Sequence, residues 1–176
     1  MHNFKSRQHK LWLAGGVGLC LLIAILGILQ GTQVSAQATT YYVATNGNDS
    51  TGSGSLAQPW RTIEHAVDVV PDGSTILVRP GRYDGLVRLR RVFANGIIVR
   101  SEVAYQAQLR HSSTVVQCFY GKGITLEGFD IAHSGAGAGA LVIQIQDLIG
   151  TPGGDDSVSR IVLRNNILHD SYNNDI

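Results

Sequence analysis

The chain has 176 residues, with 14 Lys and Arg against 13 Asp and Glu, which gives a formal net charge of +1 at pH 7. This length accommodates at most one ordinary domain, and the near-neutral charge argues against a strongly basic nucleic-acid-binding surface. Two Cys exclude a disulfide-rich mini-protein and a four-Cys zinc site, and the 21 Gly follow no Gly-X-Y period, which excludes collagen.

Residues 1–38 have the pattern of a targeting segment. A basic start that ends at Lys10 precedes an uncharged apolar run, residues 11–29, and small-x-small exits follow before Gln37 and before Thr39. This order is typical of a secretory signal peptide, whereas the length of the run approaches that of a membrane span. We therefore expect a cleaved signal or an N-terminal membrane anchor, and a secreted or cell-surface protein.

Beyond residue 38 the balance of charge changes. The 138 remaining residues have lost three basic side chains, so 11 basic residues stand against 13 acidic ones, a net charge of −2. Cys118 is the single Cys of this part, which leaves no partner for an intrachain disulfide. We interpret it as a small buried apolar residue.

The segment 60–70 is predicted to be a helix. Its apolar residues fall on one face, at i, i+3, i+4 and i+7, and they are Ile63, Ala66, Val67 and Val70. The Pro71-Asp72-Gly73 turn ends it. Before it, residues 41–44 are predicted to be a short strand and residues 46–55 a polar loop, because turn-forming residues dominate there.

Short apolar strands follow the helix in three series. In the first, equivalent Ile residues stand 21, 27 and 37 residues apart, and a loop-like insertion at 150–159 accounts for the longest interval; they are Ile76, Ile97, Ile124 and Ile161. The second series comprises residues 86–91, 114–119 and 141–146, with spacings of 28 and 27, and the third comprises residues 82–83, 108–110, 130–132 and 167–169. Three strands per repeat predict a solenoid with three faces, whose stacked coils share one core.

We therefore expect an all-β fold of about three coils over residues 74–176, with the helix covering the first coil. The last residues, 173–176, fall where a new strand is expected, and no capping element follows them. Because open parallel strand edges favour aggregation, we expect the chain to be the N-terminal part of a longer protein, or a truncated form of one.

Residues 41–176 resemble the pectate-lyase-like right-handed parallel β-helix superfamily. The resemblance rests on a short strand, a polar loop, a capping helix and a strand–turn–strand motif made of Asp72-Gly73, Thr75, Ile76, Val78, Pro80-Gly81 and Tyr83. The Asn165-Asn166 bend is similar to the later coils of that superfamily. The resemblance implies a right-handed single-stranded parallel β-helix with an N-terminal helical cap over residues 39–176. It leaves the activity open, because lyases, hydrolases, epimerases and non-enzymatic surface proteins share this fold.

Polar residues alternate with apolar ones in the second series, which places them on the exposed face. They are Arg88, Arg90, Gln117, Gln144 and Gln146. Arg engages a uronate carboxylate with two parallel hydrogen bonds, and Gln offers a donor and an acceptor to hydroxyl groups. We consider them candidate polysaccharide-binding residues; the alternative is an ordinary solvated sheet face.

Asp155 and Asp156, in the insertion, are candidate ligands of Ca²⁺, which several related lyases use to bind uronate. Calcium takes six to eight oxygens, so the alternative is a polar loop. Lys122, the single Lys beyond residue 38, is a candidate base for lyase chemistry, or a solvated turn residue. A hydrolase would need paired carboxylates, and Asp130, Asp147 and Asp170 form no compelling pair in the sequence.

His111, His133 and His169 each lie at or after a third-series strand, and packing at bends is the favoured interpretation. The leading functional hypothesis is an exported, monomeric, carbohydrate-active protein: a polysaccharide lyase or glycoside hydrolase relative acting on an acidic polysaccharide. The alternatives are a non-catalytic cell-surface or adhesin-like β-helix binding protein, and an inactive fragment. Catalytic residues are not assigned.

Overall fold

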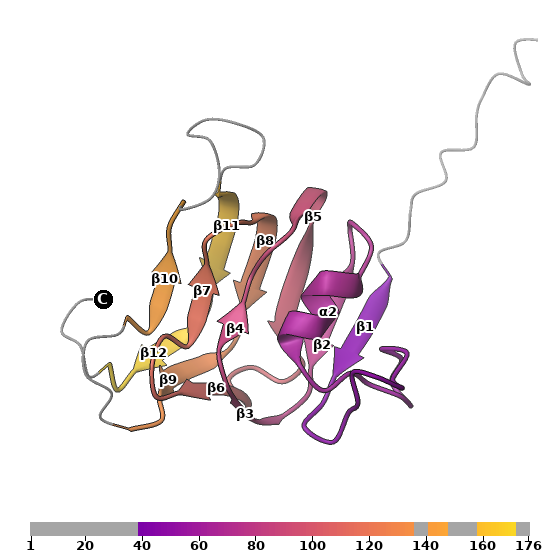
Figure 1. Ribbon diagram of the computed structural model, residues 1–176. Coiled ribbons are helices and arrows are strands. Elements are labelled where there is room, and N and C mark those ends of the chain that lie inside the picture. Colours follow the sequence, from indigo (N-terminus) through magenta and orange to yellow (C-terminus); the bar gives the residue numbers. More distant parts are fainter. Residues whose placement is uncertain (1–38, 136–140, 148–157, 172–176) are drawn as a thin grey trace, which may run out of the picture. The chain divides into compact units, whose positions relative to one another are not determined.

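The computed structural model of the protein describes residues 39–135, 141–147 and 158–171 (Figure 1). All of them belong to the second of the two units into which the chain divides, Met1–Gln37 and Ala38–Ile176. The expected targeting segment and the candidate calcium ligands Asp155 and Asp156 lie outside the described residues. Within the described ranges, no helix is long and apolar enough to cross a membrane.

The strands of the described residues form three sheets, named A, B and C here, and neighbouring strands pair in parallel throughout. Sheet A has the order β1 (Thr40–Val43), β2 (Thr75–Val78), β5 (Val92–Ser101), β8 (Lys122–Glu127) and β11 (Ser159–Arg164). Sheet B contains β3 (Gly81–Asp84), β6 (Ala107–His111), β9 (Asp130–His133) and β12 (Ile167–His169). Sheet C contains β4 (Val87–Arg88), β7 (Val116–Cys118) and β10 (Ile143–Ile145).

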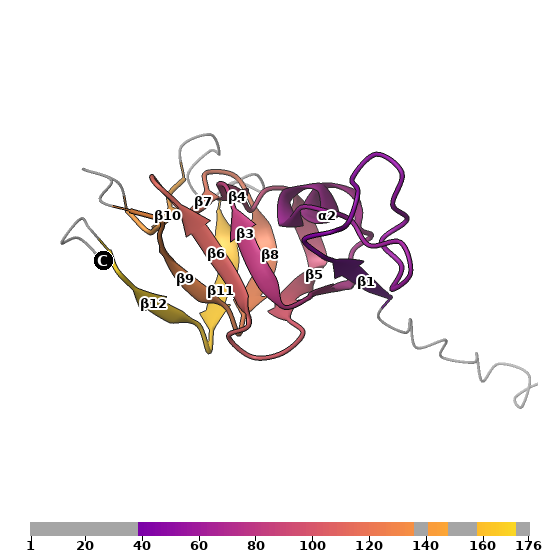
Figure 2. The ribbon, with the colours of Figure 1, turned by 90° about the horizontal axis from the view of Figure 1, so that it is seen from below.

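The chain visits the sheets in a fixed order. After β1, it passes from sheet A to B to C with β2, β3 and β4, repeats the circuit with β5, β6 and β7 and again with β8, β9 and β10, and then enters β11 and β12. Figure 2 shows equivalent strands of successive circuits lying side by side. Mostly parallel strands with one helix, among the described residues, are consistent with an all-β parallel solenoid, and the three predicted series coincide with the three sheets.

The predicted register holds in most of the fold but is wrong at two places. Ile97, Ile124 and Ile161 pair as expected, whereas Ile76 pairs with Val99, so that this interval is 23 residues and not 21. A slip of two residues leaves the inward and outward faces unchanged, because side chains alternate with a period of two. In sheet C, Val87 pairs with Val116, 29 residues on, one more than the predicted spacing of 28.

The core consists of apolar side chains stacked in rows along paired strands. In sheet A, Val99 and Leu126 are 0% exposed, and Leu163, next in the same row, is 39% exposed. In sheet B, Leu109 and Ile131 are fully buried, and Leu168 beside them is exposed. In these two rows burial is therefore complete where strands pair on both sides and is lost at β11 and β12. In the end strand β1, Val43 is also 0% exposed, and Trp60 bridges it on the side away from β2.

Cys118 in sheet C is buried, as the sequence predicted, and burial raises the pKa of its thiol to about 11. The side chain therefore behaves as a small apolar group of the core. A thiol with so high a pKa stays protonated at neutral pH, which makes it a poor nucleophile.

Helix α2 (Ile63–Val69) is shorter than the predicted segment 60–70. It begins after Thr62, whose side-chain oxygen accepts a hydrogen bond from the His65 amide. This cap satisfies an N–H group that would otherwise have no partner at the start of the helix, which favours a helix start at this position. Trp60 instead bridges Val43 in the first strand and stacks on Tyr41. The predicted apolar face is buried, and the helix contacts β1 and β4.

We predict that Leu126→Ala lowers the free energy of unfolding by about 3 kcal/mol, because it leaves a cavity between two stacked strands. Leu163→Ala, at the paired and 39% exposed position of β11, is the matched control, with an expected loss below about 1.5 kcal/mol. Urea unfolding followed by circular dichroism measures both. Equal losses would contradict the assignment of this row to the core.

Candidate functional site

Three of the five predicted binding residues form a row across sheet C. Arg88, Gln117 and Gln144 are direct partners in the parallel register of β4, β7 and β10. The preceding residues Val87 and Val116 face the core, so alternation turns the polar side chains outward. We call Arg88, Gln117 and Gln144 the polar row; neighbouring members are one strand apart, about 4.8 Å.

The other two predicted residues lie at opposite ends of this row. The Gln144 amide donates to the Oε1 atom of Gln146 at 3.3 Å, and Gln146 lies two residues further along the same chain segment, beside the row. Arg90 follows β4 and turns toward helix α2, where it meets carboxylates and not the polar row. The five predicted residues therefore share one surface but face two environments.

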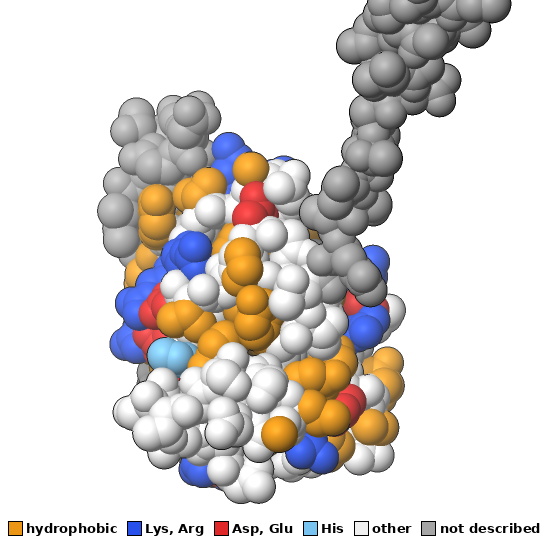
Figure 3. Space-filling model, turned by 90° about the vertical axis from the view of Figure 1, so that its right-hand side faces the viewer, with side chains coloured by type: hydrophobic (Ala, Val, Ile, Leu, Met, Phe, Trp, Pro, Cys, Tyr) orange, Lys and Arg blue, Asp and Glu red, His pale blue; other side chains and the backbone are white. Residues whose placement is uncertain are grey.

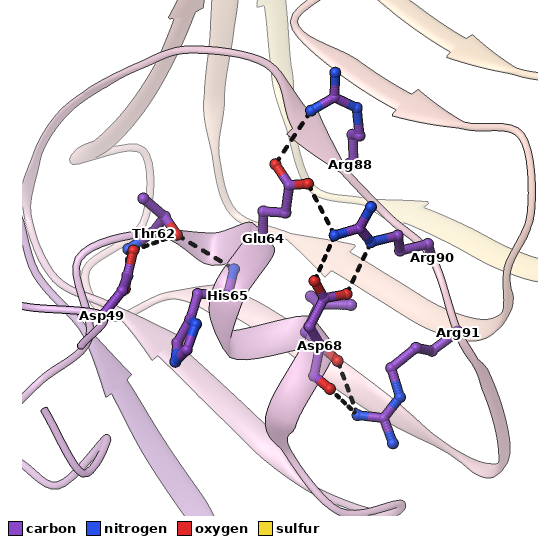
Figure 4. Close-up of polar contacts among 9 residues, drawn as sticks. Asp49, Thr62, Glu64, His65, Asp68, Arg88, Arg90 and Arg91 are labelled. Atoms are coloured by element: carbon purple, nitrogen blue, oxygen red, sulfur yellow. Dashed lines mark hydrogen bonds and ion pairs between the residues drawn. The ribbon is translucent and has the colours of Figure 1, made fainter. Parts of the chain in front are cut away.

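Two carboxylates of helix α2 hold the arginines (Figure 4). Glu64 lies 3.4 Å from Arg88 and 3.2 Å from Arg90. Asp68 accepts two parallel hydrogen bonds from Arg90, at 2.9 and 2.6 Å. The Arg90 guanidinium lowers the pKa of the Asp68 carboxyl below its usual range, and Asp68 in turn raises the pKa of Arg90.

Glu64 and Asp68 were not among the predicted site residues, although the sequence contains a signal for them. They are four residues apart in the predicted helix and therefore share one face. That face differs from the apolar one, so a helical projection would have shown two carboxylates together on a polar face of the helix. In the structure, the carboxylates of Glu64 and Asp68 balance the charges of Arg88 and Arg90.

Arg91 fixes the helix to the same strand segment. Its side chain donates hydrogen bonds to the carbonyl oxygens of Val67, Asp68 and Val70, at 3.2, 2.7 and 3.0 Å. These are carbonyls of the helix C-terminus, which lack partners within the helix. Asp49 does the equivalent at the N-terminal side, where it accepts from the backbone amide and hydroxyl of Thr62. The carboxylates of α2 are therefore held rigidly beside β4.

The structure separates other predicted candidates from this surface. Lys122 is the first residue of β8, in sheet A, and its backbone amide bonds to the carbonyl of Arg91. His111 and His133 are register partners in sheet B, whereas His169 pairs with Ala132, one position earlier. The predicted alignment of three histidines therefore holds for two of them.

Asp130 and Asp170, which looked unrelated in the sequence, both contact His169. The His169 ring lies 2.8 Å from Asp130 and 3.0 Å from Asp170. Asp130 also accepts a 2.7 Å hydrogen bond from Arg110, a nearly buried side chain. These bonds, that of Asp130 first, raise the pKa of His169. This cluster ties β12 to β9 and lies in sheet B.

No group of three or more His, Cys, Asp or Glu side chains with a geometry for metal binding occurs among the residues that the structure describes. The candidate calcium ligands, Asp155 and Asp156, are not among them.

A family model matches residues 45–103. It describes a protein of unknown function, DUF1565, a family associated with β-helix proteins. The matched segment contains α2, β2, β3, β4 and β5, and with them Glu64, Asp68, Arg88 and Arg90. Gln117 and Gln144 lie outside it. Neither the search of curated proteins nor that of solved structures found a match.

We predict that the contribution of His169 to folding declines as the pH rises. Because its folded pKa lies above the unfolded value of about 6.5, this contribution is complete below the unfolded value and is lost as pH rises through the folded pKa. The charged groups around the ring are Asp130 and Asp170, with Arg110 bound to Asp130. Urea titrations of the wild type and of His169→Gln from about pH 5 to about pH 9 measure the difference. A difference that grows with pH would overturn the prediction.

Proposed function

We propose that the protein is an exported right-handed parallel β-helix protein that binds a hydroxyl-rich polysaccharide along the polar row of sheet C. The observation that carries the proposal is the register of Arg88, Gln117 and Gln144 on successive parallel strands. The resemblance to pectate-lyase-like proteins supports a carbohydrate ligand, and the family match supports a β-helix.

The chemistry of the row suits hydroxyl groups. Each Gln amide offers two N–H donors and a carbonyl acceptor, and each sugar hydroxyl both donates and accepts. Gln117 and Gln144 are partly buried, which restricts their rotamers. An ordered side chain loses less conformational entropy when it binds. Strands about 4.8 Å apart repeat at nearly the length of one sugar ring, so that successive rings of an extended chain meet successive strands.

Export and the role of the helix belong to the same proposal. The basic and apolar pattern of residues 1–38 supports export. N-terminal sequencing of protein recovered outside the cytoplasm tests export. An intact Met1 on protein in a cytoplasmic fraction would contradict it.

The burial of the apolar face of α2 against the strands supports the role of this helix as a cap of the first coil.

We predict that Gln117→Ala and Gln144→Ala each weaken polysaccharide binding about 3- to 10-fold, as the loss of one or two neutral hydrogen bonds would. Gln108→Ala is the matched control, because Gln108 is a partly buried strand residue of sheet B. Affinity electrophoresis of the full chain through gels containing a neutral β-glucan, a xylan or polygalacturonate measures the effect.

Two results would contradict the proposal. One is that none of the three polymers retards the wild-type chain. The other is that Gln108→Ala weakens retardation as much as the two sheet C variants do. Incubation with polygalacturonate, followed by the absorbance of unsaturated products, separates a lyase from a binding protein on the same samples.

A further inference from the structure

A cavity of about 440 Å³ lies between helix α2, strand β3 and the segment that leads into β4. Its lining combines polar and apolar side chains, among them Arg61, Glu64, Asp68, Arg82, Tyr83 and Asp84. Arg90 also lines it, whereas no residue of β7 or β10 does. The cavity is therefore a separate hollow at the α2 end of the polar row.

The charges in this cavity cancel. The lining contains three arginines, Arg61, Arg82 and Arg90, and three carboxylates, Glu64, Asp68 and Asp84. Asp84 accepts from the Nε atom of Arg82 at 2.9 Å, and Asp68 binds Arg90. Figure 3 shows basic and acidic side chains intermixed at one edge of this end of the molecule and not in patches of one sign.

The paired groups keep unused hydrogen-bonding capacity. A guanidinium has five N–H donors and a carboxylate about four acceptor positions. The contacts of Arg90 with Glu64 and Asp68 use at most three of its five donors. Free donors and acceptors thus lie side by side on these ion pairs, an arrangement that matches neighbouring hydroxyl groups on a sugar ring, each of which donates and accepts.

The remaining wall supplies apolar surface. Leu86 and Val87 line it, together with the ring of Tyr83. The Tyr83 hydroxyl donates to the carbonyl of Arg79 at 2.8 Å, and burial raises its pKa to about 12, so that it stays neutral. The apolar C–H face of a sugar ring packs against a surface of this kind, while its hydroxyl groups reach the ion pairs.

Glu64 joins the cavity to the polar row. Its Oε1 atom faces Arg90 in the cavity, and its Oε2 atom faces Arg88 in the row (Figure 4). We infer that the cavity is the subsite for the terminal unit of a neutral, hydroxyl-rich polysaccharide whose following units lie along the polar row. This inference rests on the proposed function and narrows its ligand.

A uronate is disfavoured by the same geometry. Its carboxylate would enter a cavity in which Arg82 and Arg90 are already bound to protein carboxylates. It would also approach Glu64, Asp68 and Asp84, and like charges at short range repel each other. A neutral sugar unit meets neither cost.

The test compares ligands and variants by isothermal titration calorimetry of the full chain. The probes are the neutral gluco-, manno- and xylo-hexaoses, the disaccharides of the same sugars, and hexagalacturonate. The cavity variants are Arg82→Gln and Asp68→Asn, and the row variant is Gln117→Ala. Arg79→Gln is the matched control, because Arg79 pairs with Glu102 and does not line the cavity. The melting temperature of each variant is measured alongside.

We expect at least one neutral hexaose to bind about tenfold more tightly than hexagalacturonate, which corresponds to about 1.4 kcal/mol. Arg82→Gln and Asp68→Asn are expected to weaken the matching disaccharide about 3- to 10-fold. Gln117→Ala is expected to weaken the hexaose while leaving the disaccharide within twofold, and Arg79→Gln to change neither.

The outcomes separate this inference from the proposed function. If the cavity variants leave every neutral probe unchanged while Gln117→Ala weakens the hexaose, the cavity is not a subsite and the polar row stands. Tighter binding of hexagalacturonate than of each neutral hexaose also overturns the inference. If no probe and no polymer binds the wild-type chain, both proposals fall.

Discussion

The in-register stacking of parallel strands is the constraint on which the rest of this structure depends. In the interior of a sheet, an inward apolar side chain is buried by its equivalents on the two neighbouring strands, as Leu126 is by Val99 and Leu163. Where one neighbour is missing among the described residues, as at Leu163 and Leu168, the same row becomes exposed. A solenoid of this kind obtains its stability from nearest-neighbour interfaces between repeats.

The same register places the outward side chains. Because Val87 and Val116 must face the core, Arg88 and Gln117 are aligned on the outside. The core thus determines the geometry of a polar surface that contributes little to stability. Helix α2 then adds Glu64 and Asp68 to one end of that surface, and Arg91 binds the carbonyls of the helix C-terminus. Core, helix and candidate site are therefore mechanically linked.

The sequence predicts the sheets well because the alternation of apolar and polar residues that marks a strand is visible within a few consecutive residues. It predicts register less well, since a slip of two residues at Ile76 preserves every apolar face. The three series located Arg88, Gln117 and Gln144 on one face, a result of the same alternation. The sequence did not predict the contacts between distant segments. Arg90 contacts Asp68, and His169 contacts Asp130, 39 residues away. Such pairs depend on how coils stack, and alternation alone does not encode that.

The central claim is that a polysaccharide lies along the polar row of sheet C. The most direct measurement is NMR titration of the full chain with a neutral hexaose, following the side-chain amide signals of its Gln residues. The account predicts that the signals of Gln117 and Gln144 shift in a saturable manner while that of Gln108, in sheet B, does not. Saturable shifts confined to sheets A or B, with the Gln117 and Gln144 signals unmoved, would contradict it.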